Sequence, residues 1–154
     1  MKKLAGVLAI AVCMKAFSGC GLLSLFNKEE KSNKDRAAEV LSLDLSAATV
    51  AEEWDTHGGI HGDGVTFLKL SVADGFESNL GTGWQAFPLT EGSDVYKYYY
   101  EWGGTFEHPD VSGVKVIPEI ENGYWWYEAE RQQNWIFAAL DVDTDTFYYY
   151  KFDS

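Results

Sequence analysis

Hydrophobic and polar residues alternate with a period of two in several parts of the chain, and this alternation predicts β-strands with one buried face. Residues 41–46 alternate leucine with serine or aspartate, which predicts a first strand. Residues 65–72 give the clearest pattern, and the Asp74-Gly75 pair that follows predicts a turn. Residues 47–54 fit either a continuation of the first strand or a short helix.

The last third of the chain predicts three more strands. Residues 124–130 alternate like a half-buried strand. Residues 135–140 are apolar on both faces, which favours a central strand, and residues 147–152 form the last one. Aspartates and threonines fill residues 141–146, and they predict a hairpin turn because their side chains bond to nearby backbone amides.

Residues 76–113 carry a weaker pattern. Residues 77–84 contain two glycines and predict a loop or a broken helix, and residues 107–113 are rich in turn-forming residues. Through residues 96–102 a strand fits the aromatic alternation, and a helix with an aromatic stripe fits almost equally. Together the patterns predict an α+β fold: a mostly antiparallel sheet of about five strands with one or two short helices, after a signal peptide and a tether.

Composition and charge narrow the class of protein. The chain has 154 residues, enough for one domain and a leader, and 46% of them are hydrophobic, so a core is available. Its formal net charge of −12 repels nucleic acid, so we expect no nucleic-acid partner, whereas cations and basic partners are tolerated. Both cysteines lie within residues 1–20, so residues 40–154 contain neither a disulfide nor a cysteine metal site.

Residues 1–19 predict a signal peptide, since two lysines precede an apolar stretch that is too short to span a membrane. The stretch ends in Phe17-Ser-Gly-Cys20, which resembles a bacterial lipobox. That resemblance implies cleavage before Cys20 and acylation of its side chain. The lipid bilayer would then be a partner, with the protein anchored on the extracytoplasmic side of the cell membrane or in the outer membrane. An ordinary signal peptide and an uncleaved N-terminal anchor are the alternatives.

Residues 20–39 predict the lipidated cysteine followed by a flexible charged tether, and residues 40–154 predict a single globular domain. The domain contains a dense motif, Asp55-Thr-His-Gly-Gly-Ile-His-Gly-Asp-Gly64. Together with residues 117–124 and 140–150, this motif resembles a family of small uncharacterised bacterial proteins, several of them lipoproteins. The resemblance implies one folded unit and no particular activity.

The same motif supplies candidate metal ligands, Asp55, His57, His61 and Asp63, because imidazole and carboxylate groups are the ligands of zinc and iron sites. The glycines between the histidines oppose a helix, so the two rings would have to converge from a loop. The competing interpretation is a glycine-rich turn whose histidines bond to neighbouring groups and only structure the loop. We expect no cofactor, with a divalent metal at this motif as the alternative.

Two other patterns bear on function. Asp141, Asp143 and Asp145 begin like a calcium loop, but the glycine and the final acid of an EF-hand are missing. Nucleophile and phosphate-binding motifs are also missing, which favours a non-enzymatic role while leaving catalysis open.

Aromatic residues make up 16% of the chain, more than a small core needs, and alternate residues of a sheet face outward. We therefore expect some exposed rings, with Trp102, Tyr124, Trp126 and Tyr149 as candidate binding residues. Such rings beside acids suit an envelope protein, a peptide or a carbohydrate as ligand. Cross-strand packing of the same rings is the alternative.

The leading hypothesis is a membrane-anchored bacterial surface lipoprotein whose small domain binds a ligand or a partner in the cell envelope. One alternative is a metal-dependent site, catalytic or not, built from the residues of the dense motif. The other is a purely structural envelope protein.

Overall fold

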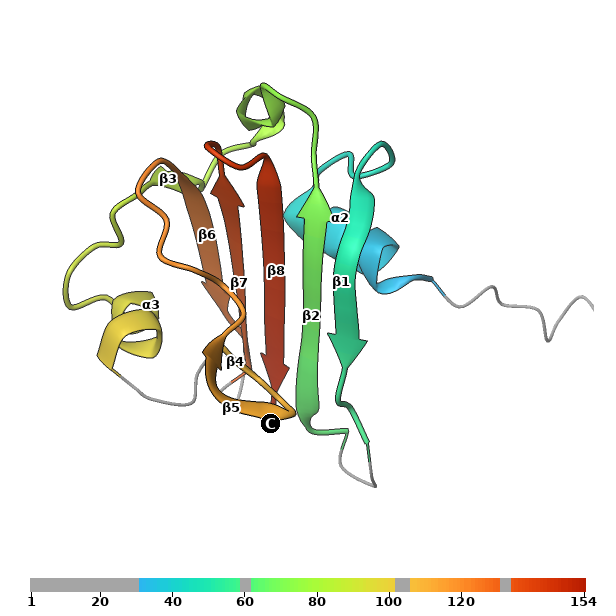
Figure 1. The fold of residues 1–154 in the computed structure, drawn as a ribbon, viewed down its shortest axis with the longest axis vertical. Coiled ribbons are helices and arrows are strands. Elements are labelled where there is room, and N and C mark those ends of the chain that lie inside the picture. Colours follow the sequence, from blue (N-terminus) through green and yellow to red (C-terminus); the bar gives the residue numbers. More distant parts are fainter. Residues whose placement is uncertain (1–30, 59–61, 102–105, 131–133) are drawn as a thin grey trace, which may run out of the picture. The chain divides into compact units, whose positions relative to one another are not determined.

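The computed structural model describes residues 31–58, 62–101, 106–130 and 134–154, and the statements below refer to these residues. Residues 32–154 form one compact unit. At its centre lies an antiparallel sheet of six strands in the order β1-β2-β8-β7-β6-β3, which confirms the predicted α+β class (Figure 1). The strands are β1 (Thr49–Asp55), β2 (Gly64–Ser71), β3 (Gln85–Ala86), β6 (Gly123–Ala129), β7 (Trp135–Asp141) and β8 (Thr146–Asp153).

Four of these strands, β2, β6, β7 and β8, were predicted from their patterns. The apolar strand β7 lies in the interior of the sheet between β8 and β6, and Trp135 to Leu140 are all buried because both faces are covered. The turn between β7 and β8 forms as expected: Asp141 Oδ1 accepts a hydrogen bond from the backbone N–H of Asp143, and Asp141 Oδ2 accepts one from Thr144 Oγ1.

The predicted strand at residues 41–46 is wrong. Helix α2 (Asn33–Leu41) ends there, Ser42 takes a left-handed conformation with φ 53°, and an irregular segment leads to β1. Leu43 and Leu45 are buried and alternate with exposed residues, so the alternation of burial is real. It arises from a chain that turns over the core, not from a strand in the sheet. Helix α2 also takes in residues 33–39, which the sequence assigned to the tether.

The middle of the chain supplies the remaining elements. The aromatic segment is helical as far as it is described, through α3 (Asp94–Tyr96) and the π-helical turn η3 (Lys97–Glu101). A 3-10 turn, η2 (Phe76–Asn79), precedes β3. The turn-rich segment contains a second, two-stranded sheet, formed by β4 (Glu107–His108) and β5 (Val111–Lys115).

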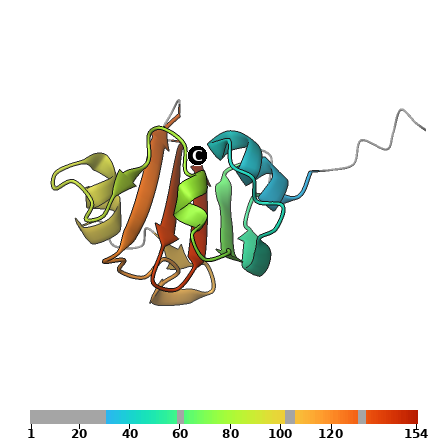
Figure 2. The ribbon, with the colours of Figure 1, turned by 90° about the horizontal axis from the view of Figure 1, so that it is seen from above.

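Hydrophobic clusters cover both faces of the main sheet. On the first face, α2 and the segment around Leu45 pack against a cluster that includes Leu68, Leu70, Ile136, Leu140, Phe147 and Tyr149. On the second face, α3, η3 and the residues flanking the β4–β5 hairpin pack against a cluster that includes Phe67, Trp135, Phe137, Tyr148 and Tyr150. Figure 2 shows α2 and the β4–β5 hairpin on opposite sides of the sheet. Within the described ranges, no helix is both long and apolar enough to cross a membrane.

Candidate functional site

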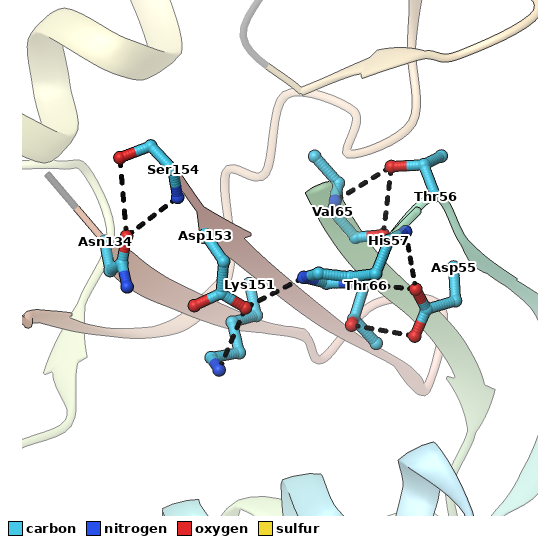
Figure 3. Close-up of polar contacts among 9 residues, drawn as sticks. All are labelled: Asp55, Thr56, His57, Val65, Thr66, Asn134, Lys151, Asp153 and Ser154. Carbon is cyan, nitrogen blue, oxygen red and sulfur yellow. Dashed lines mark hydrogen bonds and ion pairs between the residues drawn. The ribbon is translucent and has the colours of Figure 1, made fainter. Parts of the chain in front are cut away.

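The dense sequence motif meets the last strand at one end of the sheet, where a network of polar side chains forms (Figure 3). Asp55 pairs with Thr66 in the β1–β2 register, and Gly64 pairs with Asp153 in the β2–β8 register. His57 follows β1, and its ring bridges these strands. Its Nδ1 lies 2.6 Å from Asp55 Oδ1, and its Nε2 lies 2.9 Å from Asp153 Oδ2.

Two further residues complete this network, which we call the clasp: Asp55, His57, Thr66, Lys151 and Asp153. Thr66 Oγ1 donates to Asp55 Oδ2 at 3.2 Å, and Lys151 Nζ lies 3.0 Å from Asp153 Oδ2. The backbone N–H of His57 also donates to Asp55 Oδ1. Each carboxylate therefore has more than one partner, and both imidazole nitrogens can donate at once only in the imidazolium form.

The electrostatics of the clasp show most clearly at Asp55. Partial burial opposes the ionisation of Asp55. The hydrogen bonds that it accepts from the backbone and ring of His57 and from Thr66 outweigh this effect of burial and hold the pKa of Asp55 below its ordinary value. Asp55 is therefore ionised at neutral pH. The clasp consists of two carboxylates held by a histidine, a lysine and a threonine, which suits a structural junction.

Gly64 makes the clasp sterically possible. A Cβ at this position would lie 2.6 Å from the Cα and 2.7 Å from the backbone nitrogen of His57, so a larger residue would push the loop away from the sheet. Among the four glycines of the motif, Gly64 thus permits close approach of two backbone segments.

The structure brings together only part of the predicted metal set. Asp55 and His57 are in contact, Asp63 is exposed, and His61 lies outside the described residues. Both ring nitrogens of His57 face carboxylates at hydrogen-bond distance, so a metal at this ring would have to displace Asp55 or Asp153. Among the residues that the structure describes, no three His, Cys, Asp or Glu side chains are grouped to hold a metal ion. The metal site stays a prediction.

A groove of about 500 Å³ lies on the second face of the sheet, behind the clasp. Side chains of a strand alternate between faces, so Trp54, Val65 and Phe152 point to the groove whereas Asp55, Thr66 and Asp153 point to the clasp. The β4–β5 hairpin forms the opposite wall. The residues that line the groove are Trp54, Thr56, Val65, Glu107, His108, Pro109, Asp110, Ser112, Tyr150 and Phe152.

Trp54 links the sheet to the hairpin wall of the groove. Its ring stacks on Phe67 at 5.0 Å between centroids and meets His108 edge-on at 6.0 Å. His108 Nδ1 accepts the backbone N–H of Asp110 at 3.1 Å, which places the ring proton on Nε2. Within the described part of the chain, the buried indole N–H of Trp54 has no hydrogen-bond acceptor.

The four aromatic residues that we singled out as binding residues do not form this groove. Trp102 lies outside the described residues. Tyr149 is only 2% exposed and belongs to the first-face core, so it is not an exposed ring. Its strand is covered on both faces, which the sequence pattern did not reveal. Tyr124 and Trp126 are half-buried against the same first-face cluster.

The groove residues that sequence reasoning missed come from distant segments. Trp54 directly precedes the dense motif and could have been singled out for that reason. Tyr150 and Phe152 alternate with the clasp residues of β8, but only the strand register shows that they meet Trp54. Nothing in the sequence around His108 points to a role at this site.

Cys20, the expected lipidation site, lies outside the described residues. No family model, no curated protein and no solved structure matches the chain. The resemblance of its motifs to a family of small bacterial proteins therefore stays a prediction, and function has to be argued from the clasp and the groove.

Proposed function

We propose that the protein is a lipid-anchored lipoprotein of the bacterial cell envelope whose domain binds a ligand in the groove. The observation that carries the binding role is the groove itself. Its volume lies in the range of ligand pockets, about 300–1,000 Å³. It combines the rings of Trp54, Tyr150 and Phe152 with a small number of polar groups on the hairpin.

Trp54, which lines the groove, has a buried indole N–H without an acceptor among the described residues. A buried donor without an acceptor costs about 1–3 kcal/mol. The groove itself offers apolar surface beside a small number of polar side chains, a combination that a partly polar small molecule or a peptide segment would satisfy.

The lipid anchor rests on the N-terminal sequence, where a basic start, an apolar stretch and Phe17-Ser-Gly-Cys20 occur in the order of a lipoprotein signal. Expression of the full chain with a labelled fatty acid should label the wild type, and a Cys20→Ala variant should be unlabelled and lost from the membrane fraction. A Cys13→Ala variant is the matched control and should behave like the wild type. Labelling that persists in the Cys20→Ala variant would refute the anchor.

Binding is tested with the mature lipidated protein in vesicles, against envelope proteins, peptides and oligosaccharides. A Ser112→Trp variant places a large side chain on an exposed position of the groove wall without removing any core residue. A Ser71→Trp variant is the control, because Ser71 is an exposed strand residue at the opposite end of β2. We expect a component whose binding is lost only in Ser112→Trp. If no component binds, or if Ser112→Trp binds as the wild type does, the groove is not a ligand site.

A further inference from the structure

We infer that the ligand of the groove is a small organic cation, which carries an ammonium or guanidinium group on an apolar body. This inference rests on the proposed function, since it assumes that the groove is a binding site. It commits to a free small molecule because the groove, at about 500 Å³, matches one ligand of that size.

The charges that line the groove are all of one sign. Glu107 and Asp110 contribute carboxylates from the hairpin, and the lining contains neither lysine nor arginine. Glu52 adds a third carboxylate next to the hairpin, with its Oε1 4.0 Å from His108 Nε2. The whole chain carries a net charge of −12, so the long-range field has the same sign as the local one.

Two lysines of the described residues have partners outside the lining of the groove. Lys115 Nζ donates to the backbone carbonyl of Tyr99 at 2.7 Å and lies 5.0 Å from the centroid of that ring. Lys151 belongs to the clasp, on the other face of the sheet. His108 accepts the backbone N–H of Asp110 on Nδ1, and its Nε2 lies 4.0 Å from Glu52 Oε1.

The aromatic part of the lining favours the same class of ligand. The face of an aromatic ring attracts a cation, and Trp is the strongest of the three aromatic residues in this respect. Trp54 and Phe152 line one side of the groove and the hairpin with its carboxylates lines the other, whereas Tyr150 is only 4% exposed and stacks on Trp135. A cation with an apolar body can thus contact rings and carboxylates together, whereas an anion would be repelled by both.

The test uses a pair of probes that differ in charge but hardly in shape: acetyl-arginine amide, with a guanidinium, and acetyl-citrulline amide, with a neutral urea. Calorimetric titration of the full-length mature protein at low salt should show the arginine probe binding about tenfold more tightly, because both probes can donate hydrogen bonds to the carboxylates but only the guanidinium is charged. An Asp110→Asn variant, in which an exposed carboxylate becomes an amide, should remove most of that preference. An Asp74→Asn variant has the same change of net charge at an exposed position in the turn after β2, and it should keep the preference.

Three results would overturn the inference. Equal affinity for the two probes would make the ligand site indifferent to charge. An unchanged preference in Asp110→Asn and in an Asp110→Asn, Glu107→Gln double variant would place the cation elsewhere. Binding of an arginine-containing peptide without binding of acetyl-arginine amide would mean that the partner is a polypeptide.

The inference and the proposed function can fail separately. If a neutral oligosaccharide binds and Ser112→Trp abolishes its binding, the groove is a ligand site but its ligand is not a cation. If Ser112→Trp affects no ligand at all and neither probe binds, both are refuted.

Discussion

Replacing His57 by alanine tests whether the dense motif is built around the clasp. The change removes both ring contacts, to Asp55 at 2.6 Å and to Asp153 at 2.9 Å. It leaves the backbone N–H of residue 57 as a donor to Asp55, because that bond does not involve the side chain. The variant therefore isolates the contribution of the imidazole.

The magnitude follows from the burial of the partners. A hydrogen bond to a charged group contributes about 1.5–3 kcal/mol when buried, and an exposed ion pair about 0.2–1 kcal/mol. The clasp lies between these cases, since the side chain of Asp55 is 33% exposed and that of Asp153 is 20% exposed. Thr66 and Lys151 remain as partners of the two carboxylates. We therefore expect His57→Ala to lose about 1–2 kcal/mol of unfolding free energy, which lowers Tm by roughly 3–10 °C.

Urea unfolding followed by tryptophan fluorescence measures this loss at neutral pH. The matched comparison is a double-mutant cycle with Asp153→Asn, which should give a coupling of about 0.5–1.5 kcal/mol between the two side chains. A coupling indistinguishable from zero, with His57→Ala as stable as the wild type, would refute the structural role of the clasp.

Acid unfolding provides a second measurement on the same variant. The pKa of Asp55 is lowered in the folded state, so its contribution to stability is present above its unfolded value of 3.8 and is lost as the pH falls through the folded pKa. His57 is a principal cause of that lowering. In His57→Ala, the loss of unfolding free energy that the titration of Asp55 causes at acid pH should become smaller. If the dependence of stability on pH below about pH 4 is unchanged in this variant, His57 is not a cause of the lowered pKa of Asp55.

Three further predictions follow from the structure. Gly64→Ala should lower the free energy of unfolding by about 1–3 kcal/mol, because the new methyl group overlaps the backbone of His57. Gly81→Ala is the control and should lower it less in the same urea assay, because no atom lies within 4 Å of a Cβ at that position. Equal losses would contradict the close approach. Burial raises the pKa of Tyr150 to about 12, so between pH 10 and 12 the folded state keeps a proton that the unfolded chain loses. The contribution of Tyr150 to the free energy of unfolding should be full below pH 10 and should decline above it by up to about 1.4 kcal/mol per pH unit. A Tyr150→Phe variant whose stability declines just as steeply would refute this. Ser32→Ala removes the hydrogen bond from Asp35 N–H that caps α2 and should cost about 1 kcal/mol in unfolding free energy; no loss would mean that the start of α2 contributes nothing to the fold.

The strands that could be predicted are those whose pattern is set locally. β7 is apolar throughout because it lies in the interior of the sheet, and β8 follows it after a turn whose aspartates bond to their own neighbours. The alternation of leucine and polar residues at 41–46 led to a wrong strand prediction, because an irregular segment can also bury every second residue. There Leu43 is held by a backbone hydrogen bond to Ala38, and Asp44 accepts one from Ser46, and neither contact belongs to a sheet.

The candidate site could be predicted only in its local half. Asp55 and His57 are two residues apart, so their interaction was within reach of sequence reasoning. Asp153 is 96 residues from His57, and the two meet only because β8 pairs with β2 in one particular register. The same long-range pairing places Phe152 in the groove with Trp54. The prediction that Tyr149 is exposed was wrong for a related reason, since the elements that cover its face of the sheet come from the other end of the chain.

The clasp and the groove share the end of β8, so residues of the dense motif that mostly lie outside the groove can still affect its shape. Tyr150 and Phe152 face the groove, and Lys151 and Asp153 alternate with them on the clasp side. A shift of β8 by one residue would exchange the two sets, so whatever fixes this register also fixes the aromatic wall. The ladders with β2 and β7 set this register, and His57 adds to them by bonding across β2, from the end of β1 to the end of β8. His57 and Gly64 of the dense motif therefore hold the strand ends in place, and under the proposed function the rings on the opposite face of the sheet would contact the ligand.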